Sequence, residues 1–140
     1  MGKLISRIES KIRFSEVDSM RVVWHGNYLK YLEDGREDFG IKYELGYYNV
    51  FEFGLMTPIV KLDIDYKRMI KYGEKIIIET EYIQTNAAKI IFHYRIMNAE
   101  TNEIAVTAKS IQVFIDKNGE LQLTNPDFYT QWQEKWAQLK

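Results

Sequence analysis

Apolar and charged residues alternate along the first fourteen positions of the chain. Ile8, Ile12 and Phe14 fall on one face, and basic or acidic residues occupy the positions that face the other way. A period of two is typical of a β-strand with one buried face, so we predict a strand over residues 3–14. The mixed polar residues that follow, at 15–26, predict a loop.

From residue 27 onward the apolar positions change to helical spacing. Tyr28, Leu32 and Phe39 share one helical face, which predicts an amphipathic helix. Asn27 is expected to cap its first turn, and Gly46 stands where a C-terminal cap belongs. Glycine is a poor helix former, so glycines inside the segment predict a helix that a sheet approaches very closely. The two internal glycines are Gly35 and Gly40.

The rest of the chain returns mostly to alternation. Residues 47–57 are aromatic and irregular. Four further strands are predicted, at residues 60–67, 75–86, 89–97 and 104–115, and the short turns between the last three make neighbouring strands antiparallel. Asn125 and Pro126 are expected to cap and open a short final helix. The apolar stripe of that helix consists of Phe128, Trp132, Trp136 and Leu139. One long helix against an antiparallel sheet predicts a single α+β domain over residues 1–140.

Composition narrows the classes of function. The 140 residues carry a formal net charge of -1, which gives no electrostatic case for nucleic acid or an anionic membrane as a partner. The chain has no cysteine and only two histidines, so we expect no metal site and no thiol nucleophile. No phosphate-binding or dinucleotide-binding glycine motif is present, and no bound cofactor is expected. The first residues lack an uninterrupted apolar segment, so we expect no signal peptide and a cytoplasmic location.

One short stretch carries candidate chemistry: EVDSMRVVWHGNYLKYLEDGRE, at residues 16–37. It places Asp18 in the predicted loop and His25 at the entrance of the predicted helix. The first amides of a helix lack internal partners and lie at the positive end of its dipole, where they can stabilise a developing oxyanion. A nearby carboxylate can activate water or attack a carbonyl. From residue types alone, a turn or capping role for the aspartate is the commoner explanation.

The same stretch also resembles a known family. RFSEVDSMRVVWHGNYLKYLEDGRE is similar to the signature of hotdog-fold acyl-CoA thioesterases of the 4-hydroxybenzoyl-CoA thioesterase-like group. Two further blocks match in the same order, TPIVKLDIDYKRMIKYGEKIIIET at 57–80 and AVTAKSIQVFIDKNGEL at 105–121. The resemblance implies the hotdog fold, a long antiparallel sheet wrapped around a central helix, here with a short C-terminal helix. It also implies a homodimer, or a homotetramer built from two such dimers.

The resemblance assigns roles residue by residue. Asp18 matches the family's catalytic carboxylate. His25 matches the position whose backbone N–H polarises the thioester carbonyl, and its side chain could assist. Thr57 matches a pocket position that reaches the site across the dimer interface. Further substrate-binding positions implied by the resemblance are Val23, Trp24, Asn27 and Tyr28.

Other residues have two explanations each. Glu33 is expected to support the site through a hydrogen bond, or to act as a helix-borne base. Lys89 is a candidate for a phosphate of coenzyme A, although an exposed lysine at the start of a strand is commoner. Four aromatic residues could line an acyl pocket or pack against the helix end: Tyr47, Tyr48, Phe51 and Phe53.

Two positions depart from the family pattern. Arg21 stands where relatives often have glycine, and could tighten the loop or contact coenzyme A phosphates. Phe14 stands where some relatives have tyrosine, which removes one possible hydroxyl. The predicted function is hydrolysis of a small aliphatic or aromatic acyl-CoA to free acid and coenzyme A. The alternatives are a hydroxyacyl thioester dehydratase or hydratase that uses the His25 imidazole as base, and a non-catalytic acyl-CoA binding module.

Overall fold

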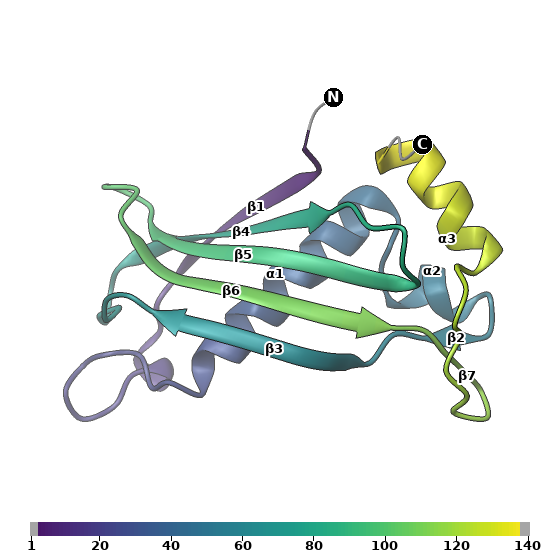
Figure 1. The fold of residues 1–140 in the computed structure, drawn as a ribbon. Coiled ribbons are helices and arrows are strands. Elements are labelled where there is room, and N and C mark those ends of the chain that lie inside the picture. The colour runs from purple at the N-terminus through teal and green to yellow at the C-terminus, as the bar shows by residue number, and fades with distance from the viewer. Residues whose placement is uncertain (1–2, 138–140) are drawn as a thin grey trace.

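The computed structural model describes residues 3–137, and they form one antiparallel sheet wrapped around a long helix (Figure 1). The sheet has five strands in the order β1-β4-β5-β6-β3. Their bounds are β1 (Ile5–Lys11), β4 (Lys75–Ile83), β5 (Lys89–Asn98), β6 (Ile104–Val113) and β3 (Ile59–Tyr66). The predicted α+β architecture and the antiparallel pairing are confirmed.

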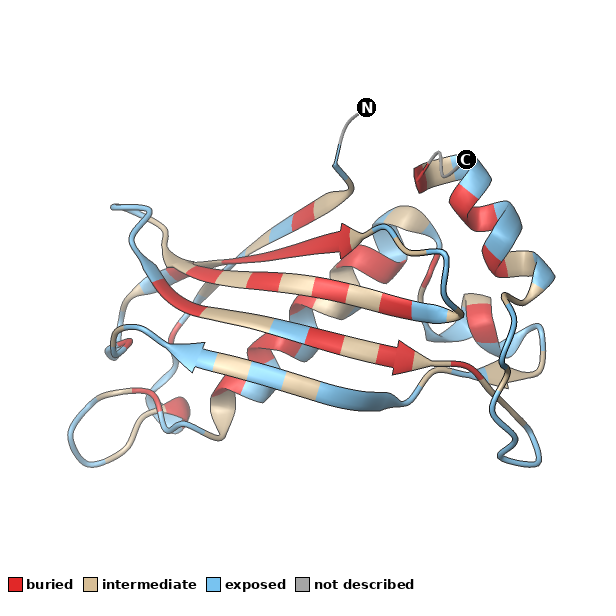
Figure 2. Cartoon of the chain, viewed as in Figure 1, coloured by how far each residue is buried: buried red, intermediate tan, exposed pale blue. Residues whose placement is uncertain are grey.

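Helix α1 (Asn27–Tyr43) buries the predicted face against the sheet. Figure 2 shows how buried positions alternate with less buried ones along β5, where every second residue turns toward the helix. The close approach predicted from glycine is confirmed at Gly35, where an added Cβ would lie 2.6 Å from the Thr80 hydroxyl. Gly40 instead meets the chain just after the helix, because a Cβ there would lie 2.7 Å from Gly46 Cα.

The ends of α1 differ from the prediction. Glu44 ends the helix in the left-handed conformation, with φ of 59°, so Gly46 is not the C-terminal cap. Gly46 is the N-cap of a further helix, α2 (Tyr47–Phe51), and Asn49 Oδ1 accepts a hydrogen bond from its N–H at 2.8 Å. The close contact restricts position 40 rather than position 46, because a Cβ at Gly46 would have Asn49 Oδ1 as its nearest neighbour, at an ordinary 3.4 Å.

Three other segments correct the predicted boundaries. β1 ends at Lys11, and a 3-10 helix, η1 (Phe14–Glu16), follows, so Phe14 does not continue the buried face and is 76% exposed. The aromatic segment expected to be irregular contains α2 and the short strand β2 (Leu55–Met56). β2 pairs with β7 (Ile115–Asp116), which splits the last predicted strand.

The chain finishes with the predicted helix, displaced by one position. Pro126 is the N-cap of α3 (Asp127–Trp132), and a π-helical turn, η2 (Gln133–Ala137), continues it. Trp132 Nε1 donates to the carbonyl of Tyr43 at 2.6 Å, so α3 covers the C-terminal end of α1. Leu139, the last residue of the predicted stripe, lies outside the described residues. No helix within residues 3–137 has the length and apolar character needed to cross a membrane.

Candidate active site

Asp18 lies in a tight turn between η1 and α1. Its N–H donates to the carbonyl of Val22 at 2.9 Å, and its own carbonyl accepts from the N–H of Arg21 at 3.0 Å. Asp18 Oδ1 accepts a hydrogen bond from the N–H of Met20 at 2.8 Å. Within residues 3–137 the other carboxylate oxygen, Oδ2, makes no hydrogen bond. One oxygen therefore orients the side chain, and the other is available to a substrate or a water.

The turn places Arg21 in a backbone conformation that is strained for most residues but not for glycine, the residue that relatives often have here. Arg21 has a φ of 63°, in the left-handed region that glycine adopts without strain. Its side chain is exposed, and its carbonyl accepts the N–H of Tyr72 at 2.9 Å. The backbone, rather than any contact of the guanidinium, therefore determines which residue suits this position.

This strain leads to a prediction about stability. Arg21→Gly should be more stable than Arg21→Ala by about 1 kcal/mol, because both remove the side chain and only glycine relieves the left-handed backbone. Thermal unfolding followed by circular dichroism should place the two midpoints about 3 °C apart. Equal midpoints would show that the turn relaxes out of this conformation.

The N-terminus of α1 presents unpaired donors beside this turn. Gly26 is the N-cap and no side chain caps the helix. The N–H of Asn27 donates to the carbonyl of Trp24 at 2.9 Å, and that of Tyr28 to the carbonyl of His25 at 3.4 Å. In the described part of the chain, the N–H groups of His25 and Gly26 make no hydrogen bond. Both amides are thus free at the positive end of a helix of 17 residues.

Gly26 is a site residue that sequence reasoning missed. The Trp24 ring lies over it, and a Cβ at position 26 would lie 2.1 Å from that ring. The same ring lies with its centroid 4.9 Å from that of His25. A side chain at position 26 would push the indole away from the two free amides. The only sequence signal was the position itself, a glycine directly before the helix.

Asn27 does not cap the helix as predicted. Its Nδ2 donates to the carbonyl of Glu16 at 2.8 Å, and the N–H of Trp24 donates to the same carbonyl at 3.0 Å. The carboxylate of Glu16 is buried, accepts the N–H of Arg13 at 2.8 Å and pairs with Lys30 at 3.3 Å. Glu16 therefore joins η1, the turn at Asp18 and the helix entrance. Glu16 lies within the quoted motif, two residues before Asp18, but the sequence motif gave it no role.

Of the remaining predicted residues near the helix entrance, two are buried and one is exposed to solvent. Val23 is buried, and its N–H donates to the carbonyl of Ile70 at 2.7 Å. Tyr28 is buried with its ring centroid 5.1 Å from that of Tyr66, and burial raises the pKa of its hydroxyl. Glu33 is exposed on α1 and makes no hydrogen bond to residues 3–137. Its supporting role stays a prediction.

Thr57 and Lys89 lie at the other end of the sheet. Thr57 precedes β3, and its carbonyl accepts Gln112 Nε2 at 2.7 Å. Lys89 begins β5, and its carbonyl accepts the Tyr129 hydroxyl at 2.7 Å. Only the far end of β3, at Tyr66, lies near the entrance of α1 (Figure 1). Eight strand residues span about 26 Å, so within one chain neither side chain joins Asp18.

The residues that do come together can carry out acyl chemistry. A carboxylate oxygen free of hydrogen bonds lies on the loop that leads into two free amides, and Glu16 ties the two parts together. Amides of this kind can hold the oxyanion of a tetrahedral intermediate. Among residues 3–137, no group of three or more His, Cys, Asp or Glu side chains is placed to hold a metal ion.

Comparison with known proteins identifies the family. The profile of the thioesterase-like superfamily matches residues 12–133. The chain therefore belongs to the thioesterase-like superfamily, a class of thioester hydrolases. A curated relative named "Putative acyl-CoA thioesterase YneP", from Bacillus subtilis (strain 168), is 29% identical over 138 residues, covering 93% of this chain and 96% of that protein.

Solved structures confirm the hotdog fold. The DHNA-CoA thioesterase of Staphylococcus aureus is similar with a TM-score of 0.83 and 27% identity, over 96% of this chain and 89% of that one. A mutant of 4-hydroxybenzoyl-CoA thioesterase in complex with 4-hydroxybenzoyl-CoA has a TM-score of 0.79 and 21% identity, over 92% and 98% of the two chains. The fold and family that the sequence motifs implied are therefore confirmed.

Proposed function

We propose that the chain hydrolyses the thioester bond of a small aliphatic or aromatic acyl-CoA in the cytoplasm, with Asp18 as its catalytic carboxylate. The observation that supports this most directly is the turn at Asp18, which leaves one carboxylate oxygen free of hydrogen bonds on the loop that leads into the unpaired amides of His25 and Gly26. Coenzyme A enters only as part of the substrate, and no further cofactor is required.

Two routes through Asp18 fit this arrangement. As a general base, Asp18 takes a proton from water while the water oxygen bonds to the acyl carbon. As a nucleophile, its oxygen bonds to that carbon and forms an anhydride, which water then cleaves. In both routes the C–S bond breaks, coenzyme A leaves as thiolate and takes up a proton, and the amides of His25 and Gly26 stabilise the oxyanion.

Aromatic side chains support an apolar or aromatic acyl group. Tyr47 and Phe51 stack at 5.7 Å on α2, and Tyr48 and Phe53 beside them are also exposed. Exposed aromatic groups of this density are typical of binding surfaces. Two structural neighbours are named for aromatic substrates, 1,4-dihydroxy-2-naphthoyl-CoA and 4-hydroxybenzoyl-CoA. The α2 surface is our proposed acyl-group contact, and it would act across the dimer interface.

The proposed dimer pairs β3 with its copy. β3 is an edge strand with exposed Ile59 and Val60. The other edge, β1, is partly covered, because Lys42 and Tyr43 both donate to the carbonyl of Ile5. Antiparallel pairing of β3 about a twofold axis brings the start of one strand beside the end of the other. Lys89 and Thr57 of one protomer would then approach the helix entrance of its partner.

His25→Ala should reduce kcat/KM by no more than about tenfold, because the proposed contribution of this residue is a backbone N–H that alanine retains. A thiol-release assay with acyl-CoA substrates of several chain lengths and ring types measures this and tests the proposed function directly. A hydratase that uses the imidazole as base would instead lose its activity in this variant. Binding of acyl-CoA with no thiol release from any substrate would establish the non-catalytic alternative.

A further inference from the structure

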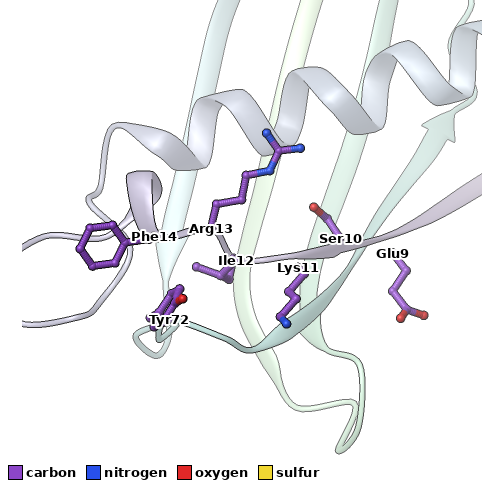
Figure 3. Close-up of a pocket in the computed structure, with 7 residues that line it drawn as sticks. All are labelled: Glu9, Ser10, Lys11, Ile12, Arg13, Phe14 and Tyr72. Carbon is purple, nitrogen blue, oxygen red and sulfur yellow. The ribbon is translucent and has the colours of Figure 1, made fainter.

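A hollow of about 530 Å³ lies at the end of β1, outside the catalytic turn. Phe14 and Tyr72 stand at one end of it with their ring centroids 5.8 Å apart, edge to face. Both rings are mostly exposed, at 76% and 51%. Figure 3 shows Lys11 extending to the same side of β1 as Tyr72, whereas Arg13 extends to the opposite side. Exposed aromatic rings beside a lysine offer a stacking surface and a positive charge to one ligand.

The charges around this hollow are unbalanced. Lys11 lies directly opposite Lys75 in the pairing of β1 with β4, and like charges in that position are destabilising. Lys71, next to Tyr72, adds a third cation. None of these lysines forms an ion pair with a carboxylate of residues 3–137. Glu74, which is close in sequence, is already bound by Arg68 at 2.8 Å. A bound polyanion would relieve this repulsion.

Hydrogen bonds connect the hollow to the catalytic turn. The N–H of Tyr72 donates to the carbonyl of Arg21 at 2.9 Å, and Val22 bridges to Lys71 in antiparallel register. Phe14 precedes Asp18 by four residues, which span about 14 Å at most. The extended phosphopantetheine arm of coenzyme A is longer than that. One coenzyme A molecule can therefore reach both the hollow and the free oxygen of Asp18.

From this juxtaposition we infer that the hollow binds the nucleotide end of coenzyme A, with adenine on the Phe14 and Tyr72 rings and phosphates on Lys11 and Lys75. The inference rests on the proposed acyl-CoA substrate and adds a subsite to it. Base stacking on aromatic side chains and charge-assisted bonds to phosphate are the interactions that such a ligand needs. Glu9, at the other end of the hollow, repels the phosphates and so fixes their direction.

Isothermal titration with adenosine 3′,5′-bisphosphate, the nucleotide fragment without the arm, tests the subsite apart from hydrolysis. Replacing both Lys11 and Lys75 by alanine should raise its Kd about tenfold or more, and added salt should weaken wild-type binding. Phe14→Ala or Tyr72→Ala should weaken binding between about fivefold and a hundredfold. Glu9→Gln should tighten it. Lys135→Ala, which removes one positive charge at the far C-terminal helix, should leave the Kd unchanged.

Hydrolysis of two matched substrates locates the effect. The double lysine variant should have a higher KM for acyl-CoA and nearly the same kcat. Its hydrolysis of the corresponding acyl-pantetheine, which lacks the nucleotide, should equal that of the wild type. Equal effects on both substrates, or no binding of the bisphosphate, would overturn the subsite. ATP that binds as tightly and inhibits without competing with acyl-CoA would mean a regulatory nucleotide site, and would also overturn it. Binding of the bisphosphate without any thioester hydrolysis would refute the proposed function and leave a nucleotide site.

Discussion

Asp18→Asn should lower kcat for acyl-CoA hydrolysis by roughly a hundredfold to ten-thousandfold and leave the fold intact. Asparagine keeps the size of the side chain, and its carbonyl oxygen can still accept the N–H of Met20 that holds the turn. It removes the charge and the basicity of the free oxygen, so both routes proposed for Asp18 fail. Steady-state thiol release gives kcat, and circular dichroism confirms that the variant is folded.

A matched control separates this effect from a general change of charge. Asp34 is exposed on α1, so Asp34→Asn alters the net charge equally and should retain the wild-type rate. Thiol release by Asp18→Asn at the wild-type rate would mean that another group is the catalytic carboxylate. A loss shared by both aspartate variants would indicate a long-range electrostatic effect instead.

Most of the fold could be predicted from the sequence because burial of one sheet face and one helix face leaves a regular pattern. Tyr28, Leu32 and Phe39 are all buried in α1. The period of two located the strands within a few residues. The prediction failed at Phe14, where the chain leaves the sheet for η1 before the alternation ends. A pattern of residue types does not record where backbone pairing stops.

The candidate site was predictable only in part. The family motif located Asp18 and His25. In the structure Asp18 lies in the loop and His25 at the helix entrance, and hydrogen bonds to Glu16 connect the two segments. Asn27 was assigned to a local cap, although its side chain bonds across to Glu16. Glu16 and Gly26 gained their roles from contacts between segments that local rules do not describe. Tertiary contacts override local preferences at such positions.

The proposed dimer makes a strong prediction about mixed proteins. If each site takes Asp18 from one protomer and the Thr57 region from the other, Asp18→Asn and Thr57→Arg should each be nearly inactive alone. Arginine at position 57 would place bulk and charge in the partner's site. A mixed dimer then contains one site with both substitutions and one site with neither. Equal amounts of the two variants should be mixed, dissociated and allowed to reassociate. About half of the dimers are then mixed and each keeps one of its two sites, so the sample should recover about a quarter of the wild-type rate.

The physical basis of this recovery is the length of β3. β3 spans about 26 Å and Thr57 lies before its first residue, so Thr57 is at least that far from Tyr66 and a site that contains both Thr57 and Asp18 has to use two chains. In the proposed dimer, association would also exclude water from the amides of His25 and Gly26, which would strengthen their interaction with an oxyanion. Mixing Asp18→Asn with Asp18→Ala, which alter the same side of the site, should restore nothing. Sedimentation at assay concentrations should show a dimer or a tetramer. Either of two results would refute the shared site: a fully active monomer, or no recovery of activity in the mixed sample.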